Sequence, residues 1–127
     1  MPLTFADVAS AFDKAMKDKD SGPLNEILSE DFSWRILARK DGASANKKQT
    51  IYWNLKTDKV QSNYKTVYES EKLVVGTFNI TSPDEKDSIV LCLGHLNREG
   101  SQVILCEHLN GPYTEGIQGM GKMGFLL

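Results

Sequence analysis

The sequence has little of several features that define whole classes of protein. It contains 2 cysteines and 2 histidines in 127 residues, and its 15 Lys and Arg against 17 Asp and Glu leave a formal net charge of −2. Two cysteines are too few for a disulfide-rich scaffold. The nearly balanced charge predicts no nucleic-acid partner, because a phosphate-binding face needs a larger basic cluster than Lys40 with Lys47 and Lys48.

Long hydrophobic runs are also missing. No apolar run approaches the roughly 20 residues that span a bilayer, and the first residues lack the basic, apolar and small-residue order of a signal peptide. We therefore predict no membrane partner and a cytoplasmic, reducing location. There, Cys92 and Cys106 are expected to be small buried hydrophobes rather than a disulfide, and no cofactor is expected.

What is present suits a single domain over residues 1–127. Hydrophobic residues make up 40% of the chain, and a chain of this length can bury a core without disulfide or metal staples. Neither a repeat nor a linker divides it. The glycines at and after position 111 predict an irregular tail with an apolar end.

Helical periodicity marks the first part of the chain. Residues 4–7 read as a capping box at the start of a first helix, a short second helix is expected through residues 24–28, and a third helix runs from about 44 to 56 with Ser44 or Asn46 as its cap. The apolar residues that recur at helical spacing on one face of the first helix are Phe5, Val8, Phe12, Ala15 and Met16.

Strand periodicity follows. Alternating apolar and polar residues predict a strand over 32–38, and further strands over 64–68, over 72–81 and in a long hairpin over 88–109 with its turn at 98–101. Helices followed by long consecutive strands indicate an α+β fold. We expect a curved antiparallel sheet with about three helices packed on its concave face.

The last hairpin carries both histidines, among residues typical of a buried sheet. A turn that sets Asn97 opposite Gln102 would place His95 and His108 on one face, whereas a change of one residue in register would place His95 with Glu107 instead. Two imidazoles in an apolar cleft could act as general base and acid, because their ordinary pKa is about 6.5. The alternative is that they are hydrogen-bonded strand residues or lie in a dimer interface.

The concave face is the expected pocket. A four-ligand zinc site built from the cysteines and histidines is excluded, because Cys92 and His95 lie an odd number of residues apart on one strand and point to opposite faces. Glu107 becomes a candidate base if it points inward, where burial raises its pKa. The predicted catalytic residues are His95, His108 and Glu107, and the predicted ligand-binding residues are Trp34, Tyr52, Phe12, Met16 and Cys106.

A resemblance to a known family rests on the segment Leu24-Asn-Glu-Ile-Leu-Ser-Glu-Asp-Phe-Ser-Trp34 after an amphipathic helix, and on the long closing hairpin. Both are similar to the nuclear transport factor two-like superfamily, which includes SnoaL-like polyketide cyclases and ketosteroid isomerases. The resemblance implies a cone-shaped, cystatin-like half-barrel with a pocket between sheet and helices. It also implies a homodimer formed through the outer sheet face.

Two departures weaken the family's known chemistries here. The first helix has no tyrosine where the isomerases take an oxyanion donor, and Arg35 lacks the two strand aspartates that flank the arginine of the epoxide hydrolases. Two functions therefore stay open. One is a protein that binds a small apolar molecule, with isomerase or cyclase chemistry by proton transfer in the cone; the other is a non-catalytic dimeric binding or scaffold module with a filled cone. An open cleft of several hundred Å³ would favour the first.

Overall fold

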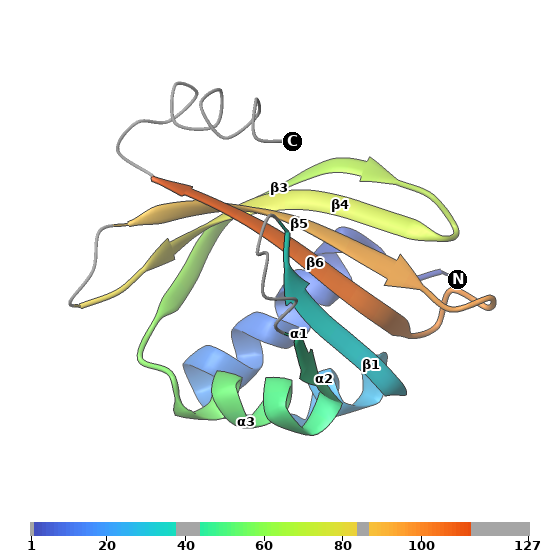
Figure 1. Ribbon diagram of the computed structural model, residues 1–127, viewed down its shortest axis with the longest axis horizontal. Helices are drawn as coiled ribbons and strands as arrows, with labels where there is room; N and C mark the ends of the chain where they lie inside the picture. The colour runs from blue at the N-terminus through green and yellow to red at the C-terminus, as the bar shows by residue number, and fades with distance from the viewer. Residues whose placement is uncertain (1, 38–43, 84–86, 113–127) are drawn as a thin grey trace.

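The computed structural model describes residues 2–37, 44–83 and 87–112. In this part of the chain six strands form one curved sheet in the order β2-β1-β6-β5-β4-β3, and three helices lie on its concave side (Figure 1). None of the described helices is long and apolar enough to cross a membrane. The elements are α1 (Phe5–Asp18), α2 (Gly22–Ile27), β1 (Leu28–Ile36), β2 (Ser44–Asn46), α3 (Lys47–Lys56), β3 (Val60–Glu69), β4 (Leu73–Thr81), β5 (Ser88–Leu96) and β6 (Val103–Pro112).

The predicted α+β class with helices on the concave face is confirmed, but the sheet is mixed rather than wholly antiparallel. β1 runs parallel to β6, with Trp34 beside Cys106 and Arg35 beside Glu107, while the other neighbouring strands are antiparallel. Alternation along a strand predicts which residues share a face, but it carries no information about the direction of the partner strand.

The first helix begins where the sequence predicts. The Thr4 hydroxyl accepts a hydrogen bond from the Asp7 amide (3.1 Å), and the Thr4 amide donates to the Asp7 carboxylate (2.9 Å). Both hydrogen bonds of the predicted capping box are therefore present. The helix ends at Lys19 in the left-handed region. All five residues of its predicted apolar face are buried.

The third helix is shorter than predicted. α3 starts at Lys47 because the Asn46 side chain caps it by accepting from the Gln49 amide, which confirms one of the two predicted caps. Ser44 belongs to the short edge strand β2, so the prediction that the helix begins there is wrong. The irregular tail was predicted to begin at Gly111, but Gly111 and Pro112 belong to β6; the rest of the predicted tail lies outside the described residues.

The register of the last hairpin differs from the prediction by one residue. The predicted turn is present, because the Asn97 amide donates to the Gln102 carbonyl at 2.8 Å. Just beyond it a β-bulge leaves Ile104 without a partner, so His95 pairs with Leu105 instead of Ile104. The two histidines therefore lie on opposite faces, and the alternative in which His95 accompanies Glu107 is the one observed.

The core fills the space between α1 and the sheet. Phe5 from α1 is 1% exposed and lies against β4 at Gly76, where a β-carbon would overlap the Phe5 ring. Gly76 is therefore required by close approach rather than by backbone conformation. The other fully buried large side chains are Phe32, Leu24, Leu28, Val8, Val74, Val90, Val103 and Cys106.

Gly76→Ala should destabilise the fold because the added methyl has no room beside Phe5. We expect the free energy of unfolding, measured by urea denaturation, to fall by about 1 to 3 kcal/mol, the usual cost of overpacking a core. Gly22→Ala is the matched control, since Gly22 is exposed at the start of α2 and its added methyl meets only Asp20 Oδ1, at 3.1 Å. Equal unfolding midpoints for the two variants would contradict this account of the core.

Candidate functional site

Two polar clusters lie on opposite faces of the sheet where β1, β6 and β5 are neighbours. The outer cluster consists of Arg35, Glu107 and His95, on the face without helices; the inner cluster consists of Trp34, His108, Cys92 and Cys106, on the concave face. Each strand contributes to both clusters, because successive side chains point to opposite faces of a sheet.

Glu107 is the centre of the outer cluster. Its carboxylate accepts from Arg35 Nε at 2.9 Å and lies 2.7 Å from both Arg35 Nη2 and His95 Nε2. Burial raises the pKa of Glu107, which is 8% exposed, but the hydrogen bonds and positive charge of Arg35 and His95 outweigh burial and leave it below its ordinary value. Glu107 is thus an anion held by two partners.

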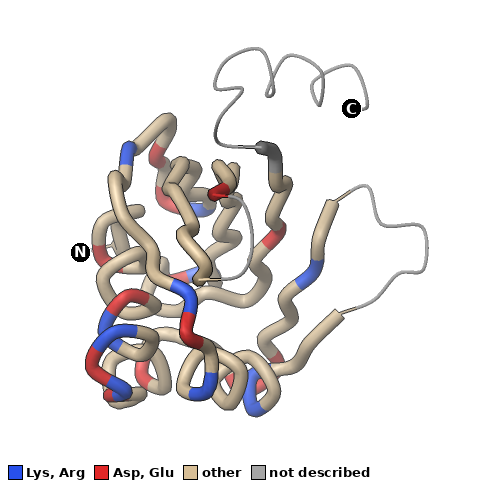
Figure 2. The backbone as a smooth tube through the Cα atoms, turned by 90° about the vertical axis from the view of Figure 1, so that its left-hand side faces the viewer, with Lys and Arg blue, Asp and Glu red and all other residues tan. Residues whose placement is uncertain are grey.

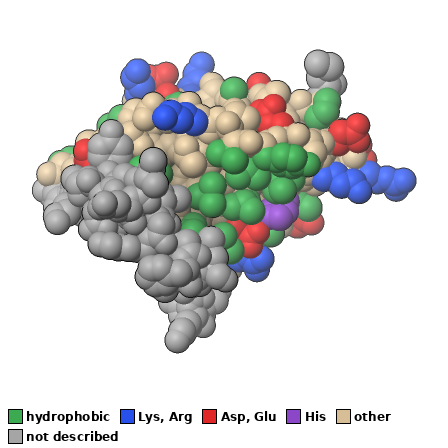
Figure 3. All heavy atoms as spheres, turned by 90° about the horizontal axis from the view of Figure 1, so that it is seen from above, with side chains coloured by type: hydrophobic (Ala, Val, Ile, Leu, Met, Phe, Trp, Pro, Cys, Tyr) green, Lys and Arg blue, Asp and Glu red, His purple; other side chains and the backbone are tan. Residues whose placement is uncertain are grey.

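The predicted inward orientation of His95 is wrong, because the bulge turns its side chain away from the helices. Glu107, whose orientation the sequence left open, points outward with it. Their predicted catalytic roles would therefore have to operate on the outer face, and those roles stay predictions. Partly exposed leucines surround the outer cluster on the same face, and Figure 3 shows hydrophobic side chains gathered there beside a histidine and charged groups. We define the leucine patch as Leu91, Leu93 and Leu105.

His108 faces the interior of the cone. Trp34 Nε1 donates a hydrogen bond to His108 Nδ1 at 3.2 Å, and the two rings meet edge to face with centroids 5.4 Å apart. Because Nδ1 accepts this hydrogen bond, the neutral imidazole carries its proton on Nε2. Phe78 contacts the same imidazole edge to face at 5.7 Å.

The two thiols lie beside this imidazole. Cys92 is 4% exposed, Cys106 is 0% exposed, and the possible ligand atoms of Cys92, Cys106 and His108 all lie within 4.8 Å of one another. The hydrogen bond that Cys106 donates to Cys92 raises the pKa of Cys106, as does burial. That hydrogen bond, with His108, lowers the pKa of Cys92 despite burial, so Cys92 is the thiol that ionises first.

The interior of the cone is filled. The cavity beside Cys92 and His108 has a volume of about 10 Å³ and is bordered by Phe12, Gln61 and Phe78 among others. This is about the space of one water molecule. Among the described residues, the expected open cleft of several hundred Å³ is not found at this position.

The predicted ligand-binding residues therefore separate into two groups. Phe12, Met16 and Cys106 are buried parts of the core, and Trp34 packs against it. Tyr52 was expected opposite the hairpin but is 64% exposed, so its predicted position is wrong. α3 turns Thr50 and Asn54 inward instead, and Tyr52 lies about 200° around the helix from Thr50, at about 100° per residue.

A polar contact inside the fold was missed by sequence reasoning. The Tyr64 hydroxyl on β3 hydrogen-bonds to Asp13 on α1 (3.0 Å), and it lies 3.2 Å from the Gln61 amide oxygen. Burial, followed by the hydrogen bond to Asp13 and its charge, raises the pKa of Tyr64 well above its ordinary value. Residues so far apart in the chain carry no shared local signal, so only the packing of α1 on β3 reveals the pair.

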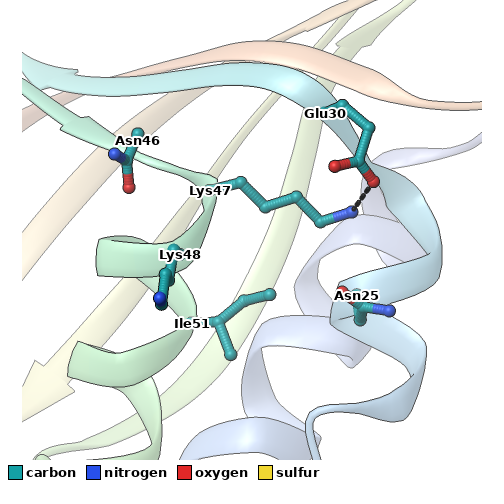
Figure 4. A pocket seen from close by; sticks show the side chains of 6 residues that line it. All are labelled: Asn25, Glu30, Asn46, Lys47, Lys48 and Ile51. Atoms are coloured by element: carbon teal, nitrogen blue, oxygen red, sulfur yellow. Dashed lines mark hydrogen bonds and ion pairs between the residues drawn. The ribbon is translucent and has the colours of Figure 1, made fainter.

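A larger hollow lies elsewhere, between α2, β1 and the start of α3 (Figure 4). It is an open groove of about 370 Å³, in which Lys47 forms an ion pair with Glu30 at 3.1 Å. None of the predicted site residues lines it; Asn25, Asn46, Lys48 and Ile51 complete its lining. Figure 2 shows charges of both signs mixed along the helices and turns.

Glu107→Gln should destabilise the protein, because the amide keeps the shape of the side chain but loses two charge-assisted hydrogen bonds. We expect the free energy of unfolding to fall by about 1.5 to 3 kcal/mol in urea denaturation. Glu99→Gln, an exposed position in the turn of the same hairpin, is the control and should change stability by less than about 0.5 kcal/mol. A Glu107→Gln protein as stable as this control would show that the outer cluster contributes nothing to stability.

No protein-family model matches this sequence, and no curated protein matches it. Solved structures do match. An M. tuberculosis LEH-like epoxide hydrolase has a TM-score of 0.61 at 9% identity, covering 94% of this chain and 94% of its own. A candidate SnoaL-like polyketide cyclase from Jannaschia has a TM-score of 0.59 at 12% identity, covering 83% and 85%. An NTF2-like protein from Cytophaga hutchinsonii has a TM-score of 0.53 at 18% identity, covering 82% and 93%.

At these identities the likeness concerns the fold and leaves the chemistry open. The similar structures carry the same family names that the sequence resemblance indicated, and the six-stranded mixed sheet with three helices on one face agrees with that architecture. The chain has the nuclear transport factor two-like fold.

Proposed function

We propose that this protein is a dimeric, non-catalytic binding or scaffold module that associates through the outer face of its sheet. The observation that carries the proposal is the filled cone: about 10 Å³ remains beside Cys92 and His108. Pockets for drug-sized ligands typically enclose about 300 to 1,000 Å³. The cone interior thus serves as a core, and the recognition surface that we propose is the other side of the sheet.

The outer face has the composition of an interface between two copies. The leucine patch supplies apolar surface next to the outer cluster, and interfaces typically combine an apolar centre with a polar rim. Arg35 has a side chain 53% exposed while it binds a carboxylate that is 10% exposed, so it can contact a partner without releasing Glu107. A two-fold interface uses the same patch on both copies, which suits a surface that carries both charges.

Leu93→Lys should convert the dimer to a monomer, because it would place a charge at the centre of the proposed interface. The readout is the molar mass by size-exclusion chromatography with light scattering. We expect the wild-type protein at micromolar concentration to have twice the mass of one chain. Tyr52→Lys is the control on the helical side, 64% exposed, and should remain dimeric. A monomeric wild-type protein would refute the proposal.

A second function is favoured by one observation, the pairing of a thiol with an imidazole beside the small cavity of the cone. An epoxide hydrolase, a candidate isomerase and candidate cyclases share this fold. In this reading a small apolar carbonyl compound binds beside Cys92 and His108 when the side chains around the cavity, Phe12 among them, rearrange. Cys92, as a thiolate, takes a proton from the α-carbon of the ketone, and His108 Nε2–H donates a hydrogen bond to the carbonyl oxygen as the enolate forms; a proton or deuteron from solvent then returns to the α-carbon.

The second function predicts proton exchange on an apolar ketone. Deuterium exchange at the α-carbons of a cyclic ketone, followed by nuclear magnetic resonance, should be accelerated by the wild-type protein and lost in His108→Gln. His95→Gln, which changes a histidine on the outer face, should keep the activity. If exchange is no faster than in buffer, this second function is excluded, and the dimeric binding or scaffold module remains the proposed function.

A further inference from the structure

We propose that Cys92, Cys106 and His108 bind a zinc ion on the concave face of the sheet. The four-ligand set considered from the sequence is impossible because His95 points the other way, but the remaining three residues face the same interior. Their ligand atoms lie within 4.8 Å of one another. Tetrahedral zinc with Zn–S bonds of about 2.3 Å places its sulfur ligands about 3.8 Å apart. Side-chain adjustments of about 1 Å therefore suffice.

Charge balance favours a divalent ion. Two thiolates and one neutral imidazole exactly compensate the charge of Zn²⁺, so the completed site adds no net charge to an apolar interior. Any unpaired charge there would be costly. Cys92 and Cys106 are 4% and 0% exposed, and Phe78 packs beside His108, so water competes little for the ligands. Thiolate and imidazole are the ligands that zinc prefers.

The fourth coordination position also has a location. The cavity of about 10 Å³ borders Cys92 and His108 and is reached by the Gln61 side chain. It has room for about one water molecule, which would complete a tetrahedral set of three protein ligands and one water. This arrangement differs from a closed structural site, in which all four ligands come from the protein.

Binding must compete with the hydrogen bond between Trp34 and His108. A metal-bound imidazole keeps the proton on its other nitrogen, so neither nitrogen can then accept from Trp34 Nε1. The indole therefore loses its acceptor when zinc binds. This coupling makes Trp34 a reporter of the site, and it predicts that removal of the indole N–H strengthens binding.

The first experiment uses the full chain, reduced and free of metal, with Co²⁺ as a spectroscopic substitute and Zn²⁺ as competitor. We expect one Co²⁺ per chain, with a thiolate-to-cobalt charge-transfer band and intense visible bands of tetrahedral cobalt, all removed by Zn²⁺. Cys92→Ser, Cys106→Ser and His108→Gln should each weaken Zn²⁺ binding by at least about tenfold. His95→Gln is the matched control from the same hairpin and should bind as the wild type does.

The second experiment tests the coupling to the indole. In a Trp53→Phe background, Trp34 is the single tryptophan, and its fluorescence should change on addition of Zn²⁺. Trp34→Phe should bind Zn²⁺ about two- to tenfold more tightly than the wild type, because no hydrogen bond has to be released. Unchanged fluorescence together with unchanged affinity would contradict the predicted competition at His108.

A third measurement does not depend on folding of the cysteine variants. Zn²⁺ should slow alkylation of both thiols in the wild-type protein by at least about tenfold, and removal of Zn²⁺ by a chelator should restore the rate. Three results would overturn the proposal: absence of the thiolate-to-cobalt band, equal loss of binding in His95→Gln, or binding of Cu⁺ without binding of Zn²⁺.

Discussion

The β-bulge at Ile104 controls which side chains of β6 face the helices and which face outward. Successive side chains of a strand point to opposite faces of the sheet. An extra residue in one strand therefore moves every later side chain of that strand to the other face, relative to its partner strand. Here it leaves His108 with Cys92 on the concave side and Glu107 with His95 on the outer side. Without the bulge both histidines would share one face, and neither cluster would exist in its present form.

The concave face of the sheet is covered by packed side chains, although other proteins use the same fold to enclose a ligand cavity. Phe5 closes on Gly76 from one side and Phe78 packs against His108 from the other, so apolar side chains occupy the space where a ligand cavity of this fold would lie. Two of the polar contacts left inside are hydrogen bonds between side chains: Trp34 donates to His108, and Tyr64 hydrogen-bonds to Asp13. These contacts satisfy groups whose burial would otherwise be costly, which is why they can persist within a packed core.

The outer face combines a charged cluster with exposed apolar side chains. Glu107 is almost buried on a surface without helices, and its hydrogen bonds with Arg35 and His95 make its burial tolerable. Leucines next to such a fixed charge provide both apolar area and orientation, two requirements of specific association. In our proposals the outer face of the sheet mediates association. The concave face contributes to a compact core that can bind a metal ion.

The sequence by itself determined the local features. The capping box at Thr4, the buried face of α1, the α+β class and the family resemblance were readable because each depends on neighbouring residues or on a short period. Tertiary structure alone decided the parallel pairing of β1 with β6, the outward position of Tyr52 and the bulge. These depend on contacts between residues far apart in the chain, where several arrangements satisfy the same local pattern and only packing selects among them.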